Sequence, residues 1–76
     1  MVRAYIFIEA NKARDLKVAE AITALPGVTR ADVVTGRFDV IVMVEVDELG
    51  ALWDTVDKIQ ALPAVVKTTT NVVVQR

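Results

Sequence analysis

The 76-residue sequence contains neither cysteine nor histidine. Without cysteine there is no disulfide framework and no thiolate to act as a nucleophile or metal ligand. Without histidine the chain also lacks the commonest general base and a principal nitrogen ligand of transition metals. We therefore expect no catalytic residue, no metal and no cofactor. A small domain without disulfides also fits a reducing cytoplasm.

Positive charge is neither in excess nor clustered. Nine Lys and Arg stand against ten Asp and Glu, which gives a net charge of −1, and the basic residues are spread from Arg3 to Arg76. Binding to nucleic acid requires a cluster of cations opposite the phosphates, so direct contact with nucleic acid is disfavoured. No apolar stretch approaches the roughly 20 residues of a membrane span, and the first residues alternate too strongly for a signal peptide. We expect a cytoplasmic protein that does not contact a membrane.

Aromatic residues are also few, at 5%, whereas 54% of the residues are hydrophobic. Val, Ile, Leu and Ala carry this apolar content, which suits strands and small helices. A chain of this length forms one domain, here residues 1–76, and buries only about 60% of its unfolded surface. The core of a monomer is therefore thin, and the composition favours a partner.

The periodicity of the apolar residues predicts four strands and two helices. Alternation predicts strands over residues 2–9, 28–34, 40–46 and 65–74. Helical spacing predicts one helix that ends at Pro26 and a second that begins with Asp47 as its N-cap and ends at Pro63. This order is that of an α+β, ferredoxin-like βαββαβ fold, with a four-stranded antiparallel sheet and two helices on one face.

The other face of the sheet is predicted to be apolar and uncovered. Right-handed crossovers place both helices on one side, yet the third strand is hydrophobic at every position from Val40 to Val44. If Val40, Val42 and Val44 meet the helices, the uncovered face displays four large side chains, which are Tyr5, Phe7, Ile41 and Met43. An exposed apolar patch of this kind predicts a homodimer, a dimeric α+β barrel in which two sheets pack face to face.

A glycine and a carboxylate stand immediately before the third strand, in the segment Thr35-Gly-Arg-Phe-Asp39. Gly36 suits a hairpin turn that requires a positive φ. Asp39 has two interpretations that the residues leave open. Its carboxylate can accept backbone N–H groups in the turn, or it can belong to a binding site.

The whole chain resembles the RAM domain, the effector-binding module of the Lrp/AsnC transcriptional regulators. The resemblance rests on the Thr35–Asp39 segment with the β-branched run after it, on two similar helix ends and on the threonine-rich last strand. The two helix ends are Ala24-Leu-Pro-Gly-Val28 and Ala61-Leu-Pro-Ala-Val65, and the last strand reads Val66-Lys-Thr-Thr-Thr-Asn-Val-Val-Val74. Typical members carry an N-terminal helix-turn-helix domain. This sequence begins at the first strand and resembles the stand-alone RAM proteins, so no DNA-binding domain is expected in it.

The resemblance implies dimers that assemble into rings, as octamers or decamers, with amino acids or similar effectors bound at contacts between dimers. The ligand-binding residues that it implies are Thr35, Gly36, Arg37, Phe38, Asp39, Thr68, Thr69 and Thr70. Their chemistry suits a free amino acid. A carboxylate can accept the ligand's ammonium group, while a glycine amide, hydroxyl groups and a guanidinium can bind its carboxylate. The sequence does not indicate which threonines face the site.

We therefore predict a non-catalytic sensor domain that modulates transcription or amino-acid metabolism indirectly. One alternative is an assembly module that pairs with full-length Lrp/AsnC regulators and binds no ligand of its own. A second alternative is a small dimeric α+β barrel enzyme of the same topology. The enzyme is disfavoured because the chain has no histidine and because its helix-facing sheet positions are nearly all Val, Ile or Ala.

Overall fold

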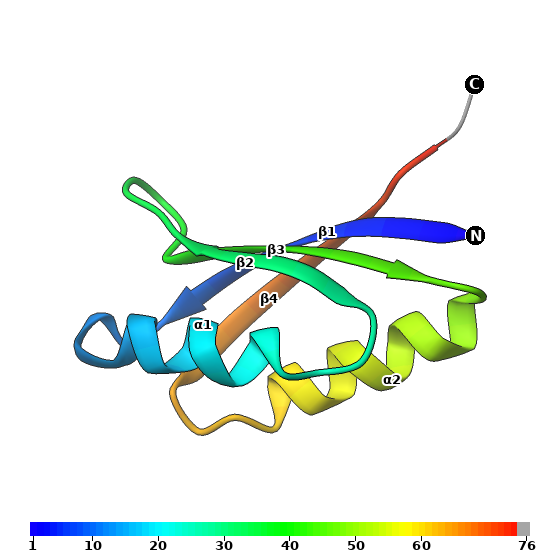
Figure 1. Cartoon of the computed structure of the whole chain (residues 1–76). Coiled ribbons are helices and arrows are strands. Elements are labelled where there is room, and N and C mark those ends of the chain that lie inside the picture. Colours follow the sequence, from blue (N-terminus) through cyan, green and yellow to red (C-terminus); the bar gives the residue numbers. More distant parts are fainter. Residues whose placement is uncertain (75–76) are drawn as a thin grey trace.

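The computed structural model describes residues 1–74 and contains four strands, two α-helices and a short 3-10 helix. In chain order these are β1 (Val2–Ala10), η1 (Lys12–Arg14), α1 (Asp15–Thr23), β2 (Val28–Val33), β3 (Val40–Val46), α2 (Leu49–Gln60) and β4 (Val65–Val72). The strands form one antiparallel sheet in the order β2-β3-β1-β4, and both helices cover the same face of it (Figure 1). The predicted ferredoxin-like fold is confirmed, whereas η1 was not predicted.

The two central strands, β1 and β3, supply the sheet side of the core. Their register pairs Ile6 with Val42 and Ile8 with Val40, and none of these four side chains is exposed to solvent. Residues directly opposite in an antiparallel pair lie on the same face, so this register turns both alternating apolar rows toward the helices. Burial of each such side chain stabilises the fold by about 1.5–3 kcal/mol.

The helix side of the core comes from residues at helical spacing. Val18 and Ile22 of α1 and Leu52, Val56 and Ile59 of α2 are buried against the sheet. Positions three and four apart fall on one side of a helix, so each helix presents one apolar stripe to the sheet. The core is therefore a single layer between the helices and one face of the sheet.

The helix ends explain how the elements are joined. After α1 the chain turns through Pro26 and Gly27, and Gly27 has a φ of +84° that favours glycine. The predicted cap of α2 was wrong: its N-cap is Glu48, which makes no side-chain capping bond. Asp47 lies one residue too early to reach the first free amides of the helix. Instead Thr55 holds α2 in place, because its hydroxyl donates to the Pro26 carbonyl oxygen at 3.1 Å.

The sheet edges are formed by β2 and β4. On β2 the exposed side chains of Arg30 and Asp32 form an ion pair at 2.7 Å, and charge on an edge strand discourages pairing with other chains. Both edge strands are shorter than predicted, since β2 ends at Val33 and β4 at Val72. Within residues 1–74 no helix is long and apolar enough to cross a membrane.

Candidate functional site

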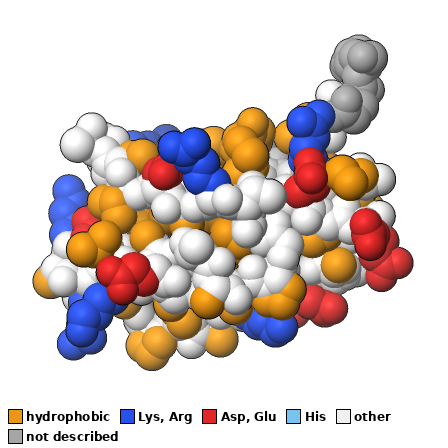
Figure 2. Space-filling view, in the orientation of Figure 1, with side chains coloured by type: hydrophobic (Ala, Val, Ile, Leu, Met, Phe, Trp, Pro, Cys, Tyr) orange, Lys and Arg blue, Asp and Glu red, His pale blue; other side chains and the backbone are white. Residues whose placement is uncertain are grey.

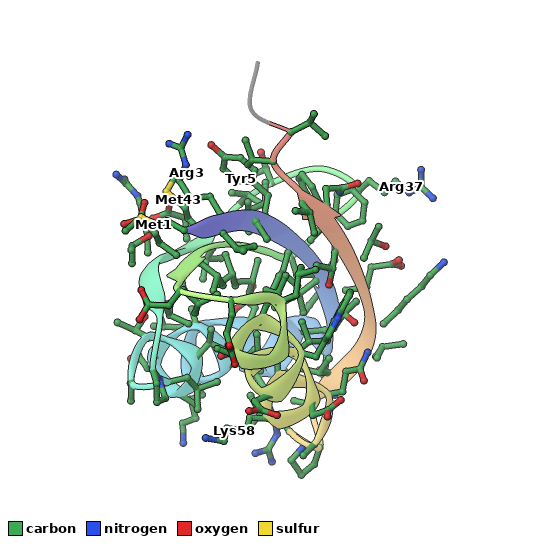
Figure 3. All side chains as sticks on the ribbon, turned by 90° about the vertical axis from the view of Figure 1, so that its right-hand side faces the viewer. Met1, Arg3, Tyr5, Arg37, Met43 and Lys58 are labelled. Atoms are coloured by element: carbon green, nitrogen blue, oxygen red, sulfur yellow. The ribbon has the colours of Figure 1, made fainter. Side chains whose placement is uncertain are left out.

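The face of the sheet opposite the helices carries a patch of large apolar side chains. Tyr5 pairs with Met43 and Phe7 with Ile41 across β1 and β3. Tyr5 is 40% exposed, and the other three are partly exposed. Tyr5 and Met43 project from the sheet away from both helices (Figure 3). The predicted facing of these four residues is confirmed, and we call them the bare-face patch.

A loop over residues 34–39 joins β2 to β3 at one end of this face. The Val34 N–H donates to the Asp39 carbonyl oxygen at 2.9 Å and closes the loop. Gly36 at its tip has a φ of +101°, as the turn prediction required, and a Cβ built there would meet nothing within 4 Å. Thr35, Gly36 and Arg37 are exposed. The tip therefore offers its backbone and side chains to a partner or ligand.

Aromatic contacts hold the base of this loop on the bare face. The Phe38 and Phe7 rings have centroids 5.1 Å apart and are tilted by 43°, a separation within the range of aromatic pairs in contact. The Arg37 guanidinium carbon lies 5.5 Å from the centroid of Phe38, within the range of a cation–π contact. Arg37, Phe38 and Phe7 thus form a continuous row from the loop onto the bare-face patch.

Asp39 is a structural anchor of the same loop. Its side chain is buried, and its Oδ2 accepts a hydrogen bond from the Ala10 N–H at 2.8 Å, while its own N–H donates to the Ile8 carbonyl oxygen at 2.8 Å. The register of β1 with β4 shifts between Glu9 and Ala10, which interrupts the ladder where the carboxylate arrives. These contacts support the interpretation in which the Asp39 carboxylate accepts a backbone N–H group. The N–H group that donates to it belongs to β1, however, and not to the turn.

The second carboxylate oxygen of Asp39, Oδ1, does not take part in this anchoring bond. Within residues 1–74 only Oδ2 accepts a hydrogen bond, and no buried side-chain oxygen lacks a partner. Oδ1 therefore reaches the surface. A carboxylate has acceptor capacity for several donors, so anchoring the loop leaves this group able to accept another.

The register of β4 separates the three threonines. Thr69 lies opposite Phe7 and so shares the bare face, whereas Thr68 lies opposite Ile8 and Thr70 opposite Ile6, on the side of the helices. Thr68 also accepts a hydrogen bond from the Gln60 side-chain amide at 2.9 Å. The structure thus brings Thr69 to the same face as the loop and turns Thr68 and Thr70 away.

Two further polar residues share this face and were missed by sequence reasoning. Lys67 lies opposite Glu9, and Asn71 lies opposite Tyr5. Both stand two positions from Thr69, so the alternation of a strand would have found them had the phase of β4 been known. The polar border of the bare-face patch is therefore Lys67, Thr69 and Asn71.

Comparison with known protein families identifies the chain. The family model of the Lrp/AsnC ligand binding domain matches residues 3–76. The chain belongs to this family. Its members are small-molecule-binding regulatory domains, so the resemblance noted from the sequence is confirmed. A comparison with curated protein sequences finds no match.

Solved structures extend this finding. A protein from Thermus thermophilus is 30% identical with a TM-score of 0.94, over 100% of this chain and 96% of that protein. AsnC from E. coli is 25% identical with a TM-score of 0.87, over 99% of this chain and 52% of AsnC. A transcriptional regulator from Neisseria meningitidis, solved as a complex with L-Met, is 21% identical with a TM-score of 0.80, over 97% of this chain and 50% of the regulator. That last likeness establishes the shared fold alone.

In this Lrp/AsnC domain two grooves lie away from the bare face. One has a volume of about 470 Å³ and lies between the start of α1 and the α2–β4 connection, and its lining includes Arg14 and Lys17. The other, of about 490 Å³, lies where β3 passes into α2 and is lined in part by Glu45, Asp47 and Glu48. Sequence reasoning identified neither. In residues 1–74 no group of three or more acidic side chains is placed to hold a metal ion.

Proposed function

We propose that this domain is a sensor of free amino acids, which bind beside the bare-face patch at contacts between dimers. The observation that supports the proposal is that the loop over residues 34–39 packs Phe38 on Phe7 of β1, which lies directly opposite Thr69 of β4. The same loop carries the exposed Gly36 backbone, Arg37 and the surface oxygen of Asp39. Membership of a ligand-binding family supports it.

The chemistry of these groups complements a free amino acid. The ligand's ammonium group can donate to Asp39 Oδ1, while the Gly36 amide, Arg37 and the Thr69 hydroxyl can donate to its carboxylate. The Phe7 and Phe38 rings supply an apolar wall for the ligand's side chain. The regulator from Neisseria meningitidis, part of which shares this fold, was solved as a complex with L-Met.

The bare-face patch is, in this proposal, the contact within the homodimer. Two central strands expose aromatic, aliphatic and thioether side chains there, and burying such a patch against a second copy removes apolar surface from water. The dimers assemble further into octamers or decamers. Through ligand-dependent assembly the domain modulates transcription or amino-acid metabolism indirectly, either by itself or with full-length regulators of the family.

Thermal unfolding of the purified chain against each of the twenty amino acids tests the proposal. A ligand that binds only the folded state stabilises it by about 2.7 kcal/mol at 100 times its dissociation constant. We expect one or a few amino acids to raise the unfolding midpoint in a concentration-dependent manner. Thr69→Val should weaken this response, whereas Thr68→Val, which changes the same side chain on the helix side, should retain it.

A flat response from an intact assembly would contradict amino-acid sensing. The anchoring bond from Asp39 to the Ala10 amide would then be the whole role of the carboxylate. In that case the domain acts as an assembly module for regulators of its own family. Light scattering recorded beside the unfolding curves shows whether the assembly is intact.

A further inference from the structure

The helix side of the molecule has a basic groove at one end. Arg14, Lys17 and Asn11 stand on its rim, and no acidic side chain lines it. Asn11 already accepts the Ala13 N–H through Oδ1 at 3.0 Å, so its NH₂ group remains as a donor. The rest of the lining is apolar and consists of Val18, Ala21, Leu62, Pro63 and Ala64. We call these eight residues the basic groove, which suits a carboxylate that is attached to an apolar group.

The opposite end of the molecule carries carboxylates beside an exposed apolar side chain. Asp47, Glu48 and Leu49, where β3 passes into α2, are all exposed, and Leu49 is 50% exposed despite its apolar side chain. We call these three residues the acidic corner. Acidic side chains gather at this end of the molecule, whereas the end where α1 begins carries both basic and acidic side chains (Figure 2).

Within residues 1–74 neither surface forms an ion pair. Among residues 1–74 the one ion pair is Arg30–Asp32 on the sheet edge, so Arg14, Lys17, Asp47 and Glu48 have no charged partner there. The molecule is 36 Å long, and the groove and the corner lie at opposite ends of it (Figure 1). The groove and the corner of one copy therefore cannot contact each other, whereas the corner of one copy can contact the groove of a second copy.

We propose that the acidic corner of one copy docks into the basic groove of a second copy, with Leu49 against the apolar floor and Asp47 and Glu48 beside Arg14 and Lys17. This contact joins two different surfaces, so it is heterologous and propagates until it closes a ring. It rests on the proposed function, because it supplies the contact through which dimers assemble further. Complementary charge also sets the orientation of the contact.

Matched charge reversals test this contact in the full chain, with mass measured by light scattering at low salt. Lys17→Glu and Glu48→Lys should each reduce the assembly to a dimer. Their controls are Lys58→Glu and Asp57→Lys, which make the same charge changes at exposed positions of α2 outside both surfaces. Lys58 projects from the helix layer (Figure 3). Both controls should retain the parent mass.

Mixing the two disrupted variants separates a specific contact from general charge effects. In an equimolar mixture the intact corner of Lys17→Glu meets the intact groove of Glu48→Lys, and the reverse contact places the introduced lysine beside the introduced glutamate. Both contacts then join opposite charges, so the mixture should restore the larger mass. Raising the salt to 1 M shortens the screening length to about 3 Å and should release dimers, because the sheet contact is apolar.

Three results would overturn the contact. These are a parent no larger than a dimer, a Glu48→Lys variant with the parent mass, and a mixture that remains dimeric. If no amino acid raises the unfolding midpoint but the mixture regains the parent mass, the sensing proposal is contradicted and the contact is supported. A restored mixture whose dissociation in salt yields monomers would support the contact and contradict the sheet-face dimer.

Discussion

Asp39 combines an internal role with an available acceptor. Its Oδ2 accepts a hydrogen bond from the Ala10 amide at the register shift of β1, and its Oδ1 reaches the surface. The sequence left a backbone role and a binding role as alternatives for this residue. The two oxygens of one carboxylate make both roles compatible, because each oxygen can accept separately.

Two substitutions at Asp39 separate these roles. Asp39→Ala leaves the buried Ala10 N–H without an acceptor and should lower the free energy of unfolding by about 1–3 kcal/mol. Asp39→Asn keeps an acceptor oxygen and should cost less, but it removes the negative charge and should abolish the amino-acid response. Urea unfolding at fixed protein concentration measures both variants. If Asp39→Ala is as stable as the parent, the carboxylate does not anchor the loop.

At the scale of the element, α2 has two distinct faces. Leu52, Val56 and Ile59 are buried against the sheet, whereas Leu49 and Trp53 are half exposed. Helical spacing accounts for the buried stripe. Leu49 and Trp53 are four residues apart and so lie on one side of the helix. Trp53, at 49% exposed, therefore lies outside the buried stripe.

A buried leucine of α2 and an exposed leucine of α1 predict different costs for the same substitution. Leu52→Ala removes a fully buried side chain and should lower the free energy of unfolding by about 2–5 kcal/mol. Leu16→Ala on α1 removes a side chain that is 62% exposed and should change it by no more than about 0.5 kcal/mol. Denaturant titration of both variants measures the difference. Equal costs would show that the stripe assigned to α2 does not face the core.

For the molecule as a whole, the bare-face patch is the surface that the proposed homodimer covers. The two helices cover one face of the sheet (Figure 1), and both central strands leave large apolar side chains on the other. A domain of this size has no further element within residues 1–74 to cover them. A second copy is the economical cover, since a twofold contact joins the same patch on both chains.

A charge placed on this face should therefore separate the dimer. Met43→Lys puts a charged group into the proposed sheet contact and should yield monomers, because an unpaired charge is costly to bury. Val66→Lys is the control, since Val66 is 76% exposed and lies outside the bare-face patch. Mass measured by light scattering distinguishes the two variants. A dimeric Met43→Lys would place the contact elsewhere.

Much of the fold followed from local patterns. Alternation and helical spacing predicted each strand and both helices, and the apolar run from Val40 to Val44 predicted two hydrophobic faces on the central strand. Element ends were less well predicted, as with β2, β4 and the cap of α2, because they depend on a hydrogen bond or a single φ value. The 3-10 turn η1 carried no pattern of its own.

The sequence by itself determined which side chains are apolar, how they alternate, and hence that one sheet face lacks a cover in the monomer. These are properties of neighbouring residues, and the periods of strand and helix translate them directly into faces. Only the tertiary structure decided that Thr69 lies on the bare face while Thr68 and Thr70 do not, and that Asp39 reaches the Ala10 amide. Strand register and loop closure join residues far apart in the chain, so no local pattern specifies them.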